Sequence, residues 1–173
     1  SRALGGIGCH FMALWMNRST ETFTHMGGEG VPWVGIAPFT NENHIFANLG
    51  DGTYCHSGIL AIRQSIASMA NITYKILFND AVAMTGGQPV DGPVSVQAIA
   101  HSVRAEGVSR IALVSDDPAH FSPADLPVGV TIHAREEMDA VQRELREIKG
   151  TTVILYDQTC ATEKRRRRKR GKL

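Results

Sequence analysis

The sequence predicts an α/β fold, specifically a three-layer α/β/α sandwich around a mostly parallel sheet. Along its 173 residues, short apolar runs alternate with amphipathic segments, which is the order that builds a parallel sheet through helical crossovers. Two runs, RIALVS (110–115) and TVILY (152–156), are almost entirely apolar, as expected for strands covered on both faces. A chain of this length can bury a sizeable core in one domain.

The first half of the chain predicts two helices and three strands. Residues 9–16 form a short helix, and residues 21–39 form a short strand followed by an ordered loop, because Gly and Pro are frequent there. Residues 44–50 form a buried strand. A helix follows over 54–71, where apolar residues recur at helical spacing, and a strand over 72–79 completes a crossover unit.

The second half continues the alternation after a loop. The predicted elements are a loop over 81–93, a helix over 95–107 that Gly107 ends, a strand over 110–116, a Pro-rich loop over 117–129, a strand over 130–134, a helix over 135–150 and a strand over 151–158.

Composition narrows the class of protein. Apolar residues make up 43% and charged residues 20% of the chain, which is ordinary for a soluble globular protein. No run of 18 apolar residues occurs, and the first ten residues lack a signal-peptide layout, so we expect no membrane partner. The odd number and wide spacing of the cysteines suit a reducing cytoplasm, where we expect the protein to be located. The cysteines Cys9, Cys55 and Cys160 are far apart, so no zinc or iron–sulfur site is expected from this chain alone. The missing initial Met suggests a piece of a longer protein.

The charge is distributed unevenly. The segment EKRRRRKRGKL (163–173) holds eight of the 18 basic residues and one of the 17 acidic ones, so the remainder carries a net charge of −6. We therefore divide the chain into a domain over 1–160 and a basic tail or linker over 161–173. Such a run can bind nucleic acid. Without interleaved aromatic residues for base stacking, we favour a solvated tail or one docked on an acidic neighbour, with no nucleic acid bound.

Polar residues follow two successive strands. Gly50-Asp51-Gly52 comes directly after the strand 44–50, and Asn79 ends the strand 72–79. The 26 residues between Gly52 and Asn79 suffice for a helix, a turn and a strand, which form a right-handed crossover. Both motifs should therefore emerge side by side at the carboxyl edge of the sheet, where α/β proteins bind ligands.

This pair predicts a magnesium–diphosphate site. The Asp51 carboxylate, the Asn79 amide oxygen and the Ala81 carbonyl would provide three oxygens, and a diphosphate and water would complete the octahedron that Mg²⁺ prefers. The glycines would admit phosphate beside the N-terminus of the following helix. A dinucleotide fold is disfavoured, since position 55 is Cys rather than a third Gly and no acidic residue follows about 20 residues later to hold a ribose. A Walker A loop is also absent. A simple Gly-Asp-Gly turn remains the alternative.

The motifs also resemble those of a known family. Gly-Asp-Gly followed by Asn at this spacing resembles the thiamine diphosphate motif. Together with GIGCH, THMGGEG, YKILFNDAVAMTGGQPVDG and YDQTCATEKRRRRKRG, the chain resembles the indolepyruvate:ferredoxin oxidoreductases, in their long fused bacterial form, within the 2-oxoacid:ferredoxin oxidoreductase family. The similarity covers nearly the whole chain. It implies a thiamine diphosphate-binding fold and a single domain of a much longer enzyme.

The resemblance implies an activity and partners. The enzyme would oxidatively decarboxylate arylpyruvates to aryl-acetyl-CoA and pass electrons to ferredoxin. This chain would bind thiamine diphosphate and Mg²⁺, while iron–sulfur clusters and CoA would be bound elsewhere in the full enzyme. A pyrimidine-binding domain would carry the activating Glu, so the fragment would be inactive alone. We also expect a homo-oligomer. The alternatives are another thiamine diphosphate-dependent decarboxylase or synthase, and a non-enzymatic nucleic-acid-binding module.

The resemblance also assigns the cofactor contacts. Met26 would wedge the cofactor into its bent shape, and His10 and Cys9 would face the diphosphate, although packing roles remain open for all three. His56 and Glu29 receive no firm role. The full predicted set is Gly8, Cys9, His10, Met26, Gly27, Gly28, Gly50, Asp51, Gly52, Thr53, Asn79, Ala81, Val82, Ala83, Met84 and Thr85, with Asp51, Asn79 and Ala81 as metal ligands.

Overall fold

A seven-stranded sheet forms the centre of the computed structural model, which describes residues 1–79, 81–82, 84, 86–90, 92 and 94–171. The strand order is β2-β1-β3-β4-β7-β5-β6, and every pair of neighbouring strands is parallel. This confirms the predicted mostly parallel sheet. The strands are β1 (Arg2–Gly5), β2 (Thr20–Phe23), β3 (Ile45–Gly50), β4 (Ile72–Phe78), β5 (Arg110–Ser115), β6 (Thr131–Ala134) and β7 (Thr151–Asp157).

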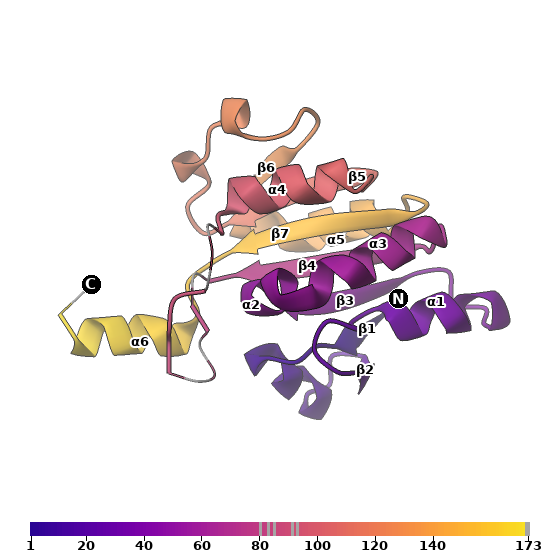
Figure 1. Cartoon of the computed structure of the whole chain (residues 1–173), viewed down its shortest axis with the longest axis horizontal. Coiled ribbons are helices and arrows are strands. Elements are labelled where there is room, and N and C mark those ends of the chain that lie inside the picture. Colours follow the sequence, from indigo (N-terminus) through magenta and orange to yellow (C-terminus); the bar gives the residue numbers. More distant parts are fainter. Residues whose placement is uncertain (80, 83, 85, 91, 93, 172–173) are drawn as a thin grey trace.

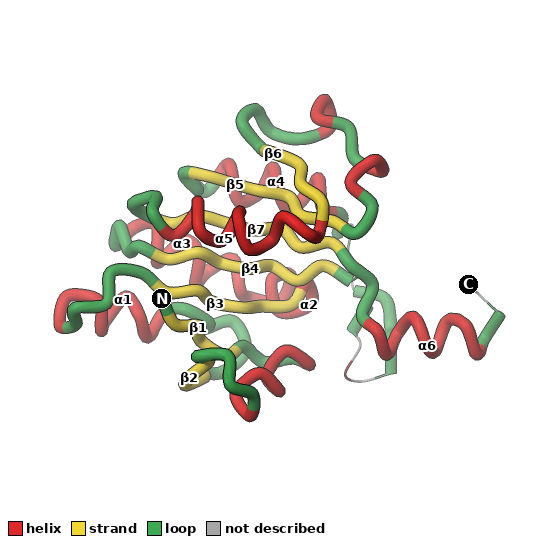
Figure 2. Tube along the Cα trace, turned by 180° about the vertical axis from the view of Figure 1, so that it is seen from behind, coloured by secondary structure: helices red, strands yellow, loops and turns green. Residues whose placement is uncertain are grey.

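Helices cover both faces of the sheet, which confirms the three layers. On one face lie α1 (Val31–Ile36), α3 (Ile59–Ala67) and α4 (Val96–Ala105), in front of the sheet in Figure 1. On the other face lies α5 (Met138–Arg146), in front in Figure 2. The larger hydrophobic cluster lies mainly under the first three helices, and a smaller one, with Val114 and Leu145, lies under α5. None of the described helices is long and apolar enough to cross a membrane.

Most elements lie where the sequence predicts them, but the ends of two helices differ. The predicted helix over 54–71 begins earlier, with the short α2 (Asp51–Thr53), continues through a π-helical segment (Tyr54–Gly58) and ends with α3. The predicted helix over 135–150 starts as a 3₁₀ turn (Arg135–Glu137) and ends at Arg146 with α5. The segment Cys9–Trp15 is helical as predicted, with 3₁₀ geometry.

Three elements were not predicted. The loop expected over 31–36 is wrong, because α1 occupies it with Pro32 in its first turn, where a missing N–H costs nothing. β1 has only four residues, too few for a periodic pattern. Most of the segment predicted to be a basic tail or linker forms a helix, α6 (Ala161–Lys169), whose Glu163 is buried while the other residues are exposed or half-buried.

The pairing of β3 with β4 brings the carboxyl ends of these two strands together. The register runs from Ile45 opposite Ile72 to Gly50 opposite Leu77. Gly50 and Phe78, the last residues of the two strands, therefore lie at one edge of the sheet, and the chain leaves both strands in the same direction. This edge carries the polar motifs that the sequence singled out.

Lys75 is a half-buried cation in the middle of β4. Its Nζ donates a hydrogen bond to Gln142 Oε1 at 3.0 Å and lies 5.0 Å from the ring centroid of Phe46. Burial lowers the pKa of Lys75 to about 8, from an ordinary value of 10.5, because the low-dielectric surroundings disfavour the charged form. The folded protein therefore holds this proton less tightly than the unfolded chain does.

We predict that Lys75→Met stabilises the domain at pH 7 and that the gain shrinks as the pH rises. Below pH 8 the charged lysine carries its full desolvation cost, and between pH 8 and 10.5 the wild type recovers stability by losing the proton. The expected gain at pH 7 is on the order of 2 kcal/mol. Urea unfolding at pH 7 and pH 9.5 measures it, with the exposed Lys149→Met as the control. An equal gain at both pH values would contradict the prediction.

Candidate functional site

Asp51 and Asn79 meet at the carboxyl edge of the sheet. Asp51 is the first residue of α2 and is 2% exposed. Its Oδ1 accepts a hydrogen bond from the Gly52 backbone N–H at 2.8 Å, and its Oδ2 accepts one from the Asn79 backbone N–H at 2.8 Å. The second bond joins the end of β3 to the end of β4. The prediction that the two motifs emerge side by side is therefore confirmed.

The oxygens gathered here suit a hard divalent cation. The Asn79 Oδ1 atom is buried and accepts no hydrogen bond from the part of the chain that the structure describes. Ala81, whose backbone carbonyl completes the predicted ligand set, lies two residues further on and is 3% exposed. A carboxylate, an amide oxygen and a backbone carbonyl are oxygen donors of the kind that Mg²⁺ binds. A buried amide oxygen without a donor costs free energy, which a bound cation would offset.

The backbone around Asp51 leaves room for a ligand. A Cβ atom placed on Gly50 would have no heavy atom within 4 Å, and one placed on Gly52 would meet only Val82 Cγ2, at 3.8 Å. Side chains at these two positions would fill space that is open beside the start of the helix. Backbone N–H groups at a helix start favour anions, so this opening suits a diphosphate. The residues present thus fit both the metal and the phosphates.

Glu29 ties two further loops to this edge. The carboxylate is 1% exposed, and it accepts hydrogen bonds from the Gly27 backbone N–H at 2.7 Å and from the Ile7 backbone N–H at 3.3 Å. Thr53 lies in the first turn of the helix that begins at Asp51, and its Oγ1 donates a hydrogen bond to the Ile7 carbonyl oxygen at 3.4 Å. The loops after β1 and β2 are therefore joined to each other and to the metal motif. The sequence analysis left Glu29 without a role, although a carboxylate flanked by glycines is a common acceptor for loop N–H groups.

The glycine loop after β2 packs closely on the π-helical segment. Gly27 has φ of 90°, and a Cβ atom there would lie 1.9 Å from Ser57 Oγ. Only glycine permits this approach without a shift of the backbone. Ser57, which the sequence analysis missed, carries no signal beyond its position one turn after the metal motif. A π-helical segment of this kind often marks a functional site.

A hollow of about 360 Å³ lies beside the glycine loop. Its lining residues come from the loop, from the start of α1 and from α3: Thr24, His25, Gly27, Gly28, Val31, Pro32, Leu60 and Ala61. Two of them, Gly27 and Gly28, belong to the predicted cofactor set. The hollow therefore lies along the glycine loop, between that loop, α1 and α3.

His10 packs over the loop that follows β1. Its ring atoms lie 2.6 Å and 2.7 Å from where Cβ atoms of Gly6 and Gly8 would be, so both positions need glycine. Burial lowers the pKa of His10 to about 4, which keeps the imidazole neutral at pH 7. A neutral ring can accept or donate one hydrogen bond but brings no positive charge to a phosphate.

Several predicted residues are exposed rather than enclosed. Cys9 is exposed, and the side chains of Met26 and Met84 are 44% and 63% exposed. His56 is exposed, and its Nδ1 lies 2.7 Å from Ser57 Oγ. Ala83 and Thr85 lie outside the described residues. The enclosed part of the site thus centres on Asp51, Asn79 and the glycine loops.

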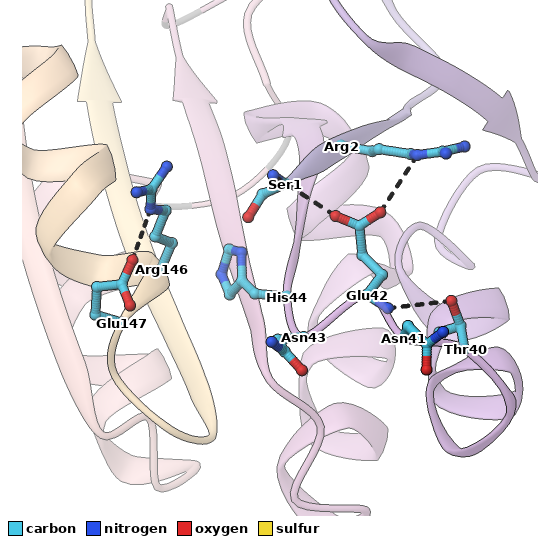
Figure 3. Close-up of a pocket in the computed structure, with 9 residues that line it drawn as sticks. All are labelled: Ser1, Arg2, Thr40, Asn41, Glu42, Asn43, His44, Arg146 and Glu147. Carbon is cyan, nitrogen blue, oxygen red and sulfur yellow. Dashed lines mark hydrogen bonds and ion pairs between the residues drawn. The ribbon is translucent and has the colours of Figure 1, made fainter.

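A second, more polar pocket lies at the opposite edge of the sheet. Figure 3 shows its residues, among which Glu42 forms ion pairs with the Ser1 amino group at 3.6 Å and with Arg2 Nε at 3.3 Å. The pocket measures about 630 Å³ and includes His44, just before β3, and Arg146, at the end of α5. It therefore lies at the amino ends of the strands. Parallel α/β sheets bind ligands at the carboxyl ends, so this larger pocket is separate from the site.

Comparison with known proteins identifies the family. A family model described as "Thiamine pyrophosphate enzyme, C-terminal TPP binding domain" matches residues 6–155. The chain belongs to this family. The curated relatives are indolepyruvate oxidoreductase subunits IorA. The one from Thermococcus kodakarensis is 27% identical over 160 residues, which are 92% of this chain and 21% of the relative. The one from Archaeoglobus fulgidus is 31% identical over 140 residues, which are 80% of this chain and 21% of the relative.

Solved structures share the fold of this thiamine pyrophosphate-binding domain. A 2-oxoglutarate:ferredoxin oxidoreductase from Magnetococcus marinus superposes with a TM-score of 0.71 at 16% identity, over 93% of this chain and 55% of that chain. A benzoylformate decarboxylase from Polynucleobacter necessarius superposes with a TM-score of 0.62 at 16% identity, over 92% of this chain and 30% of that chain. Both the fold class and the family resemblance predicted from the motifs are confirmed. The chain spans about a fifth of the length of its curated relatives.

We predict that Glu29→Ala destabilises the domain. The substitution leaves the Gly27 and Ile7 N–H groups without their acceptor inside the protein, which costs about 1–3 kcal/mol for a buried group. Urea unfolding measures the loss, and the exposed Glu136→Ala is the matched control. A midpoint of unfolding that is the same for both variants would show that the carboxylate does not hold the loops.

Proposed function

We propose that this domain anchors thiamine diphosphate through Mg²⁺ in an indolepyruvate (2-oxoacid) ferredoxin oxidoreductase. Two observations support the proposal: the hydrogen bond from the Asn79 backbone N–H to Asp51 Oδ2, which joins the ends of two adjacent strands, and the buried Asn79 Oδ1, which accepts no hydrogen bond from the described residues. The membership in the thiamine pyrophosphate family supports the cofactor, and the IorA relatives support the enzyme.

Each residue of the motif has a distinct task in this proposal. Asp51 and Asn79 hold Mg²⁺ through their side-chain oxygens, and Ala81 holds it through its backbone carbonyl. Gly50 and Gly52 keep the space beside the metal open for the diphosphate, and Thr53 lies at the start of the helix whose N–H groups face the anion. When bound, thiamine diphosphate supplies the electron sink that allows CO₂ to leave a 2-oxoacid.

The remaining predicted contacts surround this anchor. We assign the loop after β1 to the diphosphate end and the glycine loop after β2 to the ring end of the cofactor, where the partly exposed Met26 is available for contact. The loop after β4 follows Asn79 directly. The residues concerned are Gly8, Cys9, His10, Met26, Gly27, Gly28, Val82, Ala83, Met84 and Thr85.

The full reaction requires other parts of the enzyme. We propose oxidative decarboxylation of arylpyruvates to aryl-acetyl-CoA, in the cytoplasm and in a homo-oligomer, with iron–sulfur clusters, CoA and ferredoxin bound outside this chain. The pyrimidine-binding domain provides the activating Glu. In this chain the buried Glu29 is already engaged by two backbone N–H groups, which supports an origin elsewhere for that acid.

We predict that Asp51→Ala and Asn79→Ala both abolish Mg²⁺-dependent cofactor binding but differ in their effect on stability. Asp51→Ala removes the acceptor of two backbone hydrogen bonds and destabilises the protein without cofactor. Asn79→Ala removes a buried oxygen that no described residue satisfies, so stability stays the same or rises. Titration calorimetry with thiamine diphosphate and Mg²⁺ on the complete enzyme, together with thermal unfolding, measures both. Unchanged Mg²⁺ affinity in Asn79→Ala would refute the metal site.

We also predict that the isolated chain binds the cofactor weakly or not at all and does not turn over 2-oxoacids. One wall of the cleft is missing from it, because the ring end of the cofactor requires the pyrimidine-binding domain. Calorimetric titration of the isolated chain with thiamine diphosphate and Mg²⁺ tests this. Binding as tight as that of the complete enzyme would count against the proposed division between domains.

A further inference from the structure

The basic helix α6 carries one buried acidic residue that contacts the loop after β4. Glu163 is 3% exposed, although the residues that follow it, 164–170, are all Lys or Arg. Gly87 has φ of 80°, and a Cβ atom there would lie 2.2 Å from Glu163 Oε2. The carboxylate of α6 therefore lies directly against the backbone of the turn at Gly86-Gly87.

This turn is joined to the predicted metal ligand by backbone hydrogen bonds. The Gly87 N–H donates to the Val82 carbonyl at 3.0 Å, and the Val82 N–H donates to the Gln88 carbonyl at 2.8 Å. Val82 directly follows Ala81, whose carbonyl is the third proposed ligand of Mg²⁺. The Ala81–Val82 peptide, which bears this carbonyl, is thus hydrogen-bonded to the residue after Gly87, and Gly87 itself is hydrogen-bonded to Val82.

Several contacts hold Glu163 in this place. Its charge is balanced within α6 by Arg167 Nε at 3.2 Å from Oε1 and Arg166 Nη1 at 3.7 Å from Oε2. Lys164 Nζ forms an ion pair with Asp116 Oδ2 at 3.1 Å, which ties the helix to the chain after β5. The Gln158 N–H donates to the Phe78 carbonyl at 3.1 Å, so the approach to α6 runs beside the end of β4. Figure 1 shows α6 beyond the carboxyl ends of β4 and β7, at the edge that carries the site.

We propose that Glu163 is a positioning residue for the proposed Mg²⁺ site and that α6, which carries it, contributes to Mg²⁺ binding by the cofactor domain. The carboxylate supports the turn at Gly87, and the turn fixes the backbone carbonyl that completes the Mg²⁺ ligands. The inference rests on the proposed function. Substitution of a residue that orients a metal ligand without binding the metal itself typically changes metal affinity by 10- to 100-fold.

The test is a double-mutant cycle in the complete enzyme. At saturating thiamine diphosphate, Glu163→Ala should raise the Kd for Mg²⁺ by roughly 10- to 100-fold, whereas the isosteric Glu163→Gln, which still fills the space against Gly87, should recover most of the affinity. Gly87→Ala should weaken Mg²⁺ binding as well, since its Cβ collides with the carboxylate. Glu163→Ala removes that collision but not the strain of a non-glycine residue at φ of 80°, so the rise in Kd of the double variant should be smaller than the product of the two single rises.

The matched control is Arg168→Ala, an exposed residue on the same helix, which should leave the Kd for Mg²⁺ unchanged. Thermal unfolding without Mg²⁺ shows whether each variant folds. If Glu163→Ala fails to fold, the Kd for Mg²⁺ of Glu163→Gln is compared with that of Gly87→Ala instead. Wild-type Mg²⁺ affinity in Glu163→Ala, or strictly multiplicative losses in the double variant, would overturn the inference. If Asn79→Ala loses Mg²⁺ while Glu163→Ala does not, the inference fails and the proposed function stands.

Discussion

The hydrogen bond from the Asn79 N–H to Asp51 Oδ2 is the contact on which the site depends. It exists because β3 and β4 are parallel neighbours whose register ends with Gly50 opposite Leu77. A shift by one residue would turn every side chain of β4 to the other face of the sheet and separate the two motifs. The buried residues Leu49 and Ile76 resist such a shift, since both belong to the core under α3. The core packing of two strands therefore sets how Asp51 and Asn79 lie relative to each other.

The order of the strands explains why separate loops meet at one place. Five neighbouring strands, in the order β2-β1-β3-β4-β7, are all parallel, so their carboxyl ends lie along one edge. The glycine loop follows β2, the loop with His10 follows β1, Asp51 follows β3, Asn79 follows β4 and the approach to α6 follows β7. The order along the edge is thus fixed by the sheet, and side-chain contacts such as Glu29 to Ile7 only refine it. Positioning by a rigid sheet is the arrangement that a preorganised cofactor site requires.

The sequence predicted the strand ends well because apolar runs and glycines mark them, and the metal motif follows from the ends of two such runs. Local patterns could not predict β1, since four residues show no period, or α1, since Pro32 and Gly35 are also typical of loops. The burial of Glu163 could not be predicted from the sequence either. A run of like charges predicts a solvated segment, and the burial of its one acidic residue depends on a tertiary contact with Gly87, 76 residues earlier. The contacts that were missed are those that join distant segments.

The three buried carboxylates of the described chain each contact other groups of the protein, which limits what they can do in a reaction. Asp51, Glu29 and Glu163 are each at most 3% exposed, and all three lie at the carboxyl edge of the sheet. Two of them are engaged in support, Glu29 by backbone N–H groups and Glu163 by arginines, and Asp51 holds the strand ends together. An acid that exchanges a proton with the cofactor needs a carboxyl group that can reach it, whereas the oxygens of Glu29 and Asp51 already accept backbone N–H groups. The buried carboxylates of the described chain are therefore committed to holding its loops, strand ends and α6 together, which supports the proposal that the activating acid comes from another domain.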